Sequence, residues 1–339
     1  MSEEKLKKYN VGILGSTGAV GQEMVKVLGE RDFPVAELRL LASSRSAGKV
    51  VDAGKFGKVT IREASDDSFE GLDIVLGAAE NDISKKFVNS IKASGAIYID
   101  NSSAFRLDPD VPLVVPEINP DDAFKHHGVI ANPNCSTIIT LVAINGINKL
   151  SPIETLYAST YQAVSGAGAK GPVEMYEQAK AVLEGGEIKT GVFPYQIAFN
   201  LIPQIGGFGE NGYTSEEMKL QNEGRKILHM PEMKVSCTCV RVPVERSHSI
   251  SVIAITKDKL ELEDVAKAVS EAPGCRLVDD KASNVYPMPL DTSDQDTVFV
   301  GRIRRDLANE NGINLWCCGD QVRKGAATNA VQIAELFVK

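Results

Sequence analysis

Residues 12–21, Gly12-Ile-Leu-Gly-Ser-Thr-Gly-Ala-Val-Gly21, are the stretch that decides the fold. The stretch begins inside an apolar run that starts at Tyr9, and it opens a helical pattern that extends to about residue 31. Glycines at a strand-to-helix turn let the backbone approach a pyrophosphate held by the N–H groups of the helix. The spacing is GxxGxxG rather than the commoner GxGxxG, so a plain turn is the alternative interpretation.

Strand patterns and helix patterns alternate on both sides of this turn. We expect strands at 37–42, 73–79 and 96–101 and a second helix at 83–93. Such alternation is typical of a parallel, doubly wound sheet. The first part of the chain is therefore predicted to be an α/β Rossmann-type nucleotide domain.

The pattern changes after about residue 132, where a helix is expected to begin near Cys135. Longer strand-like runs follow, which predict an α+β domain with a mixed, mainly antiparallel sheet. The last segment has helical periodicity and is expected to return to the first domain. We predict domains at 1–133 with 324–339, and at 134–323. The strand-like runs lie at 153–164, 234–244, 249–257 and 297–305.

Composition excludes several classes of protein. The 339 residues are 43% hydrophobic, enough to bury a large core. The formal charge of −8 comes from interspersed charges without a basic stripe, so we expect no nucleic-acid partner. No run approaches the roughly 20 apolar residues that span a bilayer, and residues 1–10 lead into a strand without an apolar leader. We expect a cytoplasmic protein with no membrane partner.

The spacing of the six cysteines matches neither a secreted disulfide framework nor a structural zinc site. We expect free thiols and no metal. Four of the cysteines lie in strand-like runs, where small buried thiols pack like hydrophobic side chains. These four are Cys237, Cys239, Cys317 and Cys318.

The end of the second expected strand indicates which nucleotide is bound. NAD enzymes place an acid there to bind the ribose 2′-hydroxyl, whereas this chain has Ser43, Arg45 and Ser46. A guanidinium beside serines suits a 2′-phosphate through charge-assisted hydrogen bonds. We therefore predict NADP, with a solvated loop arginine as the alternative.

Cys135 is the candidate nucleophile, in the segment Ala-Asn-Pro-Asn-Cys-Ser-Thr at 131–137. The segment is expected to end a strand and begin an apolar helix, so Cys135 would lie in the first helical turn. The positive end of the helix dipole favours a thiolate. The N–H groups of the same helix end are candidates for stabilising an oxyanion. An inert cysteine is the alternative.

A thiol that attacks a carbonyl carbon needs a general base, and the chain has four histidines. His126 and His127 lie in a polar stretch typical of a helix end, and His229 is expected to close a helix. His248 instead joins two strands beside other polar residues. We therefore favour His248, with a structural role as the alternative.

The glycine turn, Ser-Ser-Arg at 43–45, Asn-Pro-Asn-Cys at 132–135 and the connection from Arg241 to His248 occur in one order along nearly the whole chain. Together they resemble the aspartate-β-semialdehyde dehydrogenase family. The resemblance implies that Cys135 forms an acyl thioester and that His248 is the acid/base. It also implies that the first domain binds NADP and that the second is catalytic and mediates dimerisation.

The resemblance assigns further residues to the substrate. Gln162 matches a glutamine that positions the acyl group or a water, and Arg241 matches the arginine that holds the substrate α-carboxylate. Arg106 and Lys219 match phosphate-binding cations, and Glu216 matches the acid that meets the ammonium group. Surface charges are the alternative for these three residues, and Glu216 with Lys219 also has the spacing of a helix i,i+3 pair. The implied cofactor contacts are Gly15, Thr17, Gly18, Ala19, Val20, Ser43, Arg45, Ser46, Ser165, Gly166 and Gln321.

The activity implied by the resemblance is NADPH-dependent reductive dephosphorylation of L-4-aspartyl phosphate to L-aspartate 4-semialdehyde, in a homodimer or a tetramer. This reversible reaction would serve lysine, threonine and methionine biosynthesis. Two alternatives stay open. One is another acyl-phosphate reductase, such as N-acetyl-γ-glutamyl-phosphate reductase, and the other is a non-catalytic nucleotide-binding redox sensor with Cys135 as its switch.

Overall fold

The computed structural model describes residues 7–338. Residues 1–6, part of the segment expected to lead into the first strand, and Lys339, part of the expected terminal helix, lie outside the described residues. The chain divides into two compact units, Met1–Pro133 with Ala326–Lys339, and Asn134–Gly325. Each unit is built around its own six-stranded sheet.

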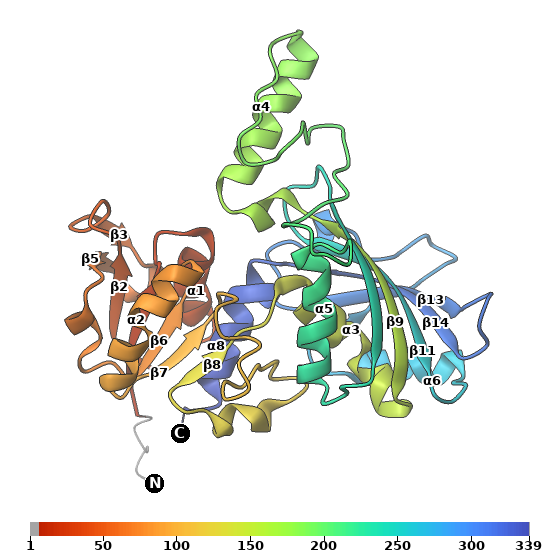
Figure 1. Ribbon diagram of the computed structural model, residues 1–339, viewed down its shortest axis with the longest axis horizontal. Helices are drawn as coiled ribbons and strands as arrows, with labels where there is room; N and C mark the ends of the chain where they lie inside the picture. The colour runs from red at the N-terminus through yellow and green to blue at the C-terminus, as the bar shows by residue number, and fades with distance from the viewer. Residues whose placement is uncertain (1–6, 339) are drawn as a thin grey trace. The chain divides into compact units, whose positions relative to one another are not determined.

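The first unit has a parallel sheet with strand order β5-β2-β1-β6-β7-β8 (Figure 1). This order is that of a doubly wound sheet, so the Rossmann-type prediction is confirmed. A small antiparallel hairpin lies beyond β2. The strands are β1 Tyr9–Leu14, β2 Val35–Ala42, β3 Val50–Asp52, β4 Lys58–Thr60, β5 Arg62–Glu63, β6 Ile74–Gly77, β7 Ile97–Asp100 and β8 Val129–Ala131.

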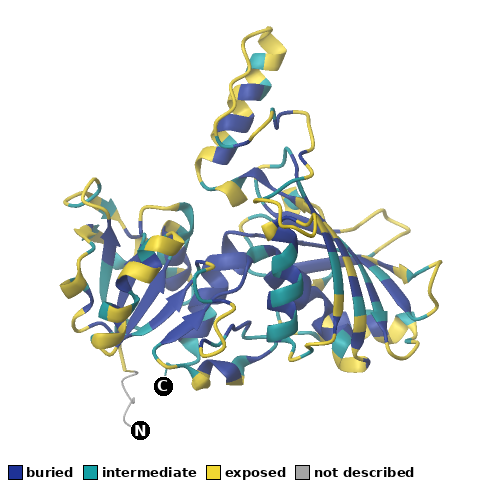
Figure 2. Cartoon of the chain, viewed as in Figure 1, coloured by how far each residue is buried: buried dark blue, intermediate teal, exposed yellow. Residues whose placement is uncertain are grey.

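Helices cover the sheet of the first unit, and its central strands are buried on both faces, as β6 is at every position (Figure 2). The terminal helix α8 contacts α1 and β7, so the expected return of the chain end to this unit is observed. The helical segments are α1 Ala19–Glu30, η1 Gly54–Phe56, η2 Asp66–Phe69, α2 Asn81–Ala93, η3 Pro120–Lys125 and α8 Thr328–Glu335.

Two glycines make the turn between β1 and α1 possible. Gly15 has a φ of 86°, and a Cβ there would lie 2.6 Å from the carbonyl oxygen of Ala78. A Cβ on Gly21, in the first turns of α1, would lie 2.4 Å from the carbonyl oxygen of Gly15. Any larger residue at either position would force β1 and α1 apart.

The second unit has the strand order β10-β9-β11-β14-β13-β12. The two outer pairs are parallel and the three inner pairs are antiparallel, so the prediction of a mixed, mainly antiparallel sheet is confirmed. The strands are β9 Ile153–Gln162, β10 Lys234–Arg241, β11 His248–Thr256, β12 Cys275–Leu277, β13 Val298–Arg305 and β14 Gly312–Gly319.

One face of this sheet is covered by helices. Helix α3 contacts β9, β11, β13 and β14, and it is buried at every residue from Ser136 to Ile147. Strand β9 alternates buried and exposed residues, so Tyr157 and Tyr161 lie on the opposite face, where Tyr161 contacts the Trp316 ring. The helical segments are α3 Cys135–Leu150, η4 Val164–Ala167, α4 Lys170–Glu184, α5 Ser215–Ile227, α6 Leu262–Glu271, α7 Pro289–Thr292 and the π-helix η5 Arg323–Ala327.

Helix α4 extends away from the sheet of its unit (Figure 1). The following segment folds back along the helix because buried Glu174 accepts hydrogen bonds from the backbone N–H groups of Gly191, Val192 and Phe193. A small apolar core beneath α4 includes Met175. The segment is therefore an ordered extension of the second unit.

The cysteines are free thiols, and the four in strand-like runs are buried as predicted. The Sγ atoms of Cys237 and Cys239 lie 3.7 Å apart on one face of β10. Among residues 7–338, no group of three or more His, Cys, Asp or Glu side chains is placed to hold a metal ion. Within the same residues, no helix has the length and apolar character needed to cross a membrane.

Candidate active site

Cys135 is the first residue of α3, as predicted. The preceding Asn134 caps the helix, because its side-chain oxygen accepts hydrogen bonds from the N–H groups of Ser136 at 3.0 Å and Thr137 at 3.2 Å. Gly325 approaches so closely that a Cβ there would lie 2.8 Å from the Cβ of Cys135. The thiol is partly exposed and sits at the positive end of a long buried helix.

The thiols in β10 and β14 have a different environment. Contact with Cys239, together with burial, raises the pKa of Cys237, and burial raises the pKa values of Cys317 and Cys318. A raised pKa keeps a thiol protonated and unreactive. These thiols are therefore suited to packing.

His248 is the first residue of β11 and is fully buried. Its Nε2 lies 3.6 Å from the Sγ of Cys135, and its Nδ1 accepts a hydrogen bond from the backbone N–H of Ala163 at 3.0 Å. Burial, helped by the positive charge of Arg241, lowers the pKa of His248 to about 3. The imidazole is therefore neutral at physiological pH.

Gln162, the last residue of β9, lies beside this pair, with its Nε2 3.4 Å from the Nε2 of His248. Its side-chain oxygen accepts a hydrogen bond from the Thr160 hydroxyl at 3.0 Å, and its Nε2 donates to Glu216 at 3.2 Å. These two partners determine the orientation of the amide. The NH₂ group consequently faces the histidine.

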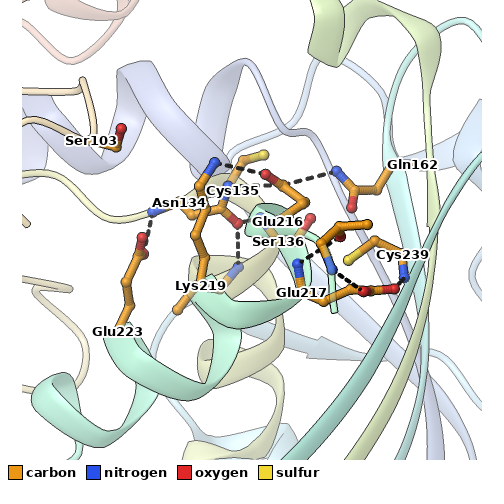
Figure 3. A network of polar contacts seen from close by, with 12 residues as sticks. Ser103, Asn134, Cys135, Ser136, Gln162, Glu216, Glu217, Lys219, Glu223 and Cys239 are labelled. Carbon is orange, nitrogen blue, oxygen red and sulfur yellow. Dashed lines mark hydrogen bonds and ion pairs between the residues drawn. The ribbon is translucent and has the colours of Figure 1, made fainter. Parts of the chain in front are cut away.

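Glu216 lies in the first turn of α5 and is buried. One carboxylate oxygen accepts hydrogen bonds from Asn134 Nδ2 at 3.0 Å and from Gln162, and the other accepts from Lys219 Nζ at 2.8 Å (Figure 3). Burial alone raises the pKa of Glu216, but the charge of Lys219 and the three donors outweigh burial and lower this pKa to about 2. The site therefore contains a permanent negative charge.

The i,i+3 pairing of Glu216 with Lys219, which the spacing offers as an alternative to a substrate role, is formed. A surface pair would not also contact the residue that precedes the candidate nucleophile, as Glu216 does through Asn134. The structure thus brings Glu216 to the cysteine, and Lys219 follows it while remaining about one third exposed.

Arg241 is the last residue of β10, and its Nη1 donates to the carbonyl oxygen of Ala163 at 2.7 Å. A Cβ on Gly166 would lie 3.0 Å both from Arg241 Nη1 and from His248 Cε1. Glycine at position 166 therefore allows η4 to pack directly on the guanidinium and the imidazole. Arg241, Gly166 and His248 form one cluster, as the sequence resemblance leads one to expect.

Ser165 and Gln321 are joined in the same unit. Gln321 donates from Nε2 to the hydroxyl of Ser165 at 2.5 Å and accepts from the N–H of Ser247 at 2.9 Å. Ser247 has a φ of 72°, and it directly precedes His248. Gln321 thus connects the segment of Ser165 with the sharp turn that leads into the histidine.

The remaining predicted site residues belong to the first unit and are described within it. Thr17 and Gly18 are exposed at the start of α1, Ala19 and Val20 are half-buried there, and Arg45 is exposed in the turn after β2. Ser43 and Ser46 flank Arg45 in this turn.

Arg106 is buried in the first unit. Its Nε donates to the carbonyl oxygen of Asn132 at 2.9 Å, and its Nη2 donates to that of Asn101 at 2.8 Å. Backbone carbonyls on two segments therefore hold the guanidinium in place.

Two residues of the site were not predicted from the sequence. Asn134 contacts Glu216 through its side chain, and its backbone N–H donates to Glu223 at 2.7 Å. An asparagine before a helix was a readable capping signal, whereas Glu223 carries no local signal. The structure also limits the expected role of helix N–H groups in stabilising an oxyanion, because those of Ser136 and Thr137 are bound to Asn134.

Two family models match the chain. The model described as semialdehyde dehydrogenase, NAD binding domain, covers residues 10–126. The model described as semialdehyde dehydrogenase, dimerisation domain, covers residues 144–324. The first matches the unit with the glycine turn, and the second matches the unit whose residues from Gln162 to Gln321 surround the cysteine.

Full-length relatives carry one name. The aspartate-semialdehyde dehydrogenase of Bacillus subtilis is 49% identical, with 97% of each chain covered, and that of Aquifex aeolicus is 50% identical, with 98% covered. Aspartate semialdehyde dehydrogenase II of Vibrio cholerae, solved in complex with ASA, has a TM-score of 0.95 at 44% identity, with 98% of each chain covered. The aspartate semialdehyde dehydrogenase of Candida albicans, solved with NADP, has a TM-score of 0.76 at 25% identity, with 98% of each chain covered.

Proposed function

We propose a function from the premise that this chain belongs to the aspartate-semialdehyde dehydrogenase family. The reaction is the reversible reductive dephosphorylation of L-4-aspartyl phosphate to L-aspartate 4-semialdehyde, a step toward lysine, threonine and methionine. The observation that carries the mechanism is the position of Cys135 Sγ at the start of α3, 3.6 Å from His248 Nε2.

In this mechanism the Cys135 thiolate attacks the acyl carbon of aspartyl phosphate. A carbon–sulfur bond forms and the carbon–oxygen bond to phosphate breaks, which leaves a thioester. When NADPH is bound, it supplies the hydride that reduces this thioester. The carbon–sulfur bond then breaks to release the aldehyde and restore the thiolate. His248 acts on the sulfur and on the carbonyl oxygen, and Gln162 orients the acyl group.

The charges around the site suit an aspartyl substrate. Arg241, which packs against Gly166 together with His248, would hold the α-carboxylate by a charge-assisted contact. The Glu216 carboxylate would meet the ammonium group. Lys219 and Arg106 would bind the phosphate, and the partial exposure of Lys219 leaves it able to contact an incoming anion.

The residues of the first unit fit a nicotinamide dinucleotide. Gly15 and Gly21 let the backbone of the turn lie close to α1, and the first turn of α1, whose residues are all described, contains no carboxylate that would repel a pyrophosphate. Arg45 is exposed between Ser43 and Ser46, as a 2′-phosphate partner must be. We therefore propose NADP as the cofactor, and the NADP complex of the Candida albicans relative supports this choice.

We further propose that the cytoplasmic enzyme is a homodimer or a tetramer of such dimers. The sheet face of the second unit opposite α3 carries Tyr157 and Tyr161, whose side chains are 47% and 37% exposed, next to Trp316. Exposed aromatic side chains on a flat sheet are typical of a subunit interface. Sedimentation of the full chain would test this assembly.

The activity is tested by incubating the enzyme with L-aspartate 4-semialdehyde, phosphate and NADP, and with N-acetyl-L-glutamate 5-semialdehyde in a parallel reaction. We expect phosphate-dependent NADPH formation with the first aldehyde. Turnover of only the acetylated aldehyde would assign the chain to N-acetyl-γ-glutamyl-phosphate reductase instead. Absence of turnover with both would favour a redox sensor that uses Cys135 as its switch.

A further inference from the structure

The protonation of His248 is determined by the nitrogen that faces away from the cysteine. The backbone N–H of Ala163 points at Nδ1 at 3.0 Å. A peptide N–H can only donate a hydrogen bond, so Nδ1 must present its lone pair. A neutral imidazole has one N–H group, which must then be at Nε2, 3.6 Å from the sulfur of Cys135.

The surroundings of the ring keep it in this orientation. Turning the ring over would place a carbon against the Ala163 N–H and lose the hydrogen bond in a fully buried environment. The backbone of Gly166 packs against the Cε1 and Nε2 edge of the ring and limits its movement. Gln162 presents its NH₂ group at 3.4 Å, beyond ordinary hydrogen-bond length, and therefore does not compete for Nε2.

Neither charged form of the ring suits this environment. An imidazolium would carry a hydrogen on Nδ1 opposite the Ala163 N–H, and it would lie beside the Arg241 cation while remaining buried. Glu216 is the opposing anion, but Lys219, Asn134 and Gln162 already contact it. A general base must become an imidazolium when it accepts a proton, so this environment opposes that role.

We propose that the Ala163 N–H holds His248 as the Nε2–H tautomer, so that the ring serves as a fixed hydrogen-bond donor to the Cys135 sulfur and to the substrate oxygen, not as a general base. This inference rests on the proposed thioester reaction and changes the role expected for His248 within it. His248 is a catalytic residue, because it faces the reacting atoms, and Ala163 is a positioning residue.

The proton balance of the reaction agrees with a donor that keeps its proton. The thiol proton leaves to solvent before the attack, and the resulting thiolate accepts the Nε2–H hydrogen bond. Negative charge moves to the carbonyl oxygen as the carbon–sulfur bond forms, and the same N–H then stabilises that oxygen. The departing phosphate takes its proton from water, so the ring neither gains nor loses a proton.

The first test is ¹⁵N NMR of the full-length enzyme labelled on its histidine rings, with the His248 signals assigned by comparison with a His248→Gln variant. We expect the Nδ1 signal of His248 to be that of an unprotonated nitrogen and the Nε2 signal that of a protonated one, without change between about pH 6 and pH 9. A proton on Nδ1, or conversion to the imidazolium within this range, would overturn the proposal.

The second test compares the rates of thioester formation in His248→Gln and His248→Ala, with His127→Gln, at an exposed position, as the control. A glutamine amide can donate near the Nε2 position but cannot act as a base. We expect His248→Gln to exceed His248→Ala by roughly tenfold or more, since one lost donor costs about 10²-fold to 10³-fold. Equal rates in two folded variants would refute the donor role.

The two proposals fail in different ways. If the wild-type enzyme turned over neither aldehyde, the proposed function would be wrong, while the NMR signals would still report the tautomer. If the enzyme were active but Nδ1 carried the proton, only the donor role would be lost.

Discussion

The side-chain amide of Asn134 donates to Glu216 Oε1 at 3.0 Å while its oxygen caps the helix that begins at Cys135. One side chain thus fixes both the start of α3 and the carboxylate on the first turn of α5. The nucleophile and the proposed ammonium-binding group therefore share a support. Disturbing Asn134 should affect the geometry of both.

Replacing Asn134 by alanine or by aspartate separates the two contacts. Asn134→Ala removes the cap and leaves a buried carboxylate oxygen with one donor fewer, so we expect the free energy of unfolding to fall by about 1–3 kcal/mol. Asn134→Asp keeps a capping oxygen but places a carboxylate against Glu216, so kcat should fall. Urea unfolding and steady-state kinetics measure the two effects, and an Asn134→Asp enzyme with wild-type kcat would contradict the shared support.

Cys135 should differ from the other thiols in chemistry as well as in position. We expect Cys135→Ser to lower kcat on the order of 10⁴-fold or more, because removal of a nucleophile abolishes the covalent route. Cys275→Ser is the matched control, since Cys275 is also partly exposed but donates to the carbonyl oxygen of Val142. Comparable losses of activity in the two folded variants would argue against a thioester on Cys135.

The neutral burial of His248 has a consequence for stability in acid. Its pKa is about 3 in the folded protein, below the roughly 6.5 of an unfolded chain, so the unfolded state takes up the proton first as the pH falls. Stability from this residue is complete above about pH 6.5 and is lost progressively toward pH 3. Between pH 7 and pH 5 the loss amounts to about 2 kcal/mol.

Urea unfolding at pH 7 and pH 5 tests this dependence. The wild-type protein should lose about 2 kcal/mol more than His248→Gln, since glutamine does not titrate. Glu216, with a folded pKa of about 2 against an ordinary value of 4.5, contributes to acid sensitivity mainly below pH 5 and does not obscure the comparison. Identical pH dependence in the two proteins would mean that His248 is not held neutral.

Local features of this fold could be predicted from the sequence. The glycine turn, the alternation of strands and helices, and the cysteine at the start of a helix each depend on residues close together in the chain. The chemistry of the site depends on distant partners instead. Glu216 lies 54 residues from Gln162, and Ala163 lies 85 residues from His248. A backbone N–H has no signature in the sequence, so the partner of His248 Nδ1 required the structure.

Two glycines of the nucleotide turn should differ in their tolerance of alanine. A Cβ on Gly21 would lie 2.4 Å from the carbonyl oxygen of Gly15, whereas a Cβ on Gly18 has its nearest neighbour at 3.5 Å. Gly21→Ala should therefore weaken binding of the dinucleotide and destabilise the protein, while Gly18→Ala should fold normally. Thermal unfolding with and without NADP measures both effects, and equal behaviour would contradict the close approach of α1 to the turn.

The choice of NADP over NAD should depend on Arg45. Arg45→Asp replaces a cation that suits the 2′-phosphate with a carboxylate that repels it and can accept a hydrogen bond from a free 2′-hydroxyl. We expect the KM for NADP to rise by about tenfold or more, which corresponds to roughly 1.4 kcal/mol, with a much smaller change in the KM for NAD. Lys49→Asp makes the same change of charge at another exposed position of this segment and should leave the NADP to NAD ratio almost unaltered. If both variants shifted the ratio equally, long-range charge rather than a contact at Arg45 would explain the preference.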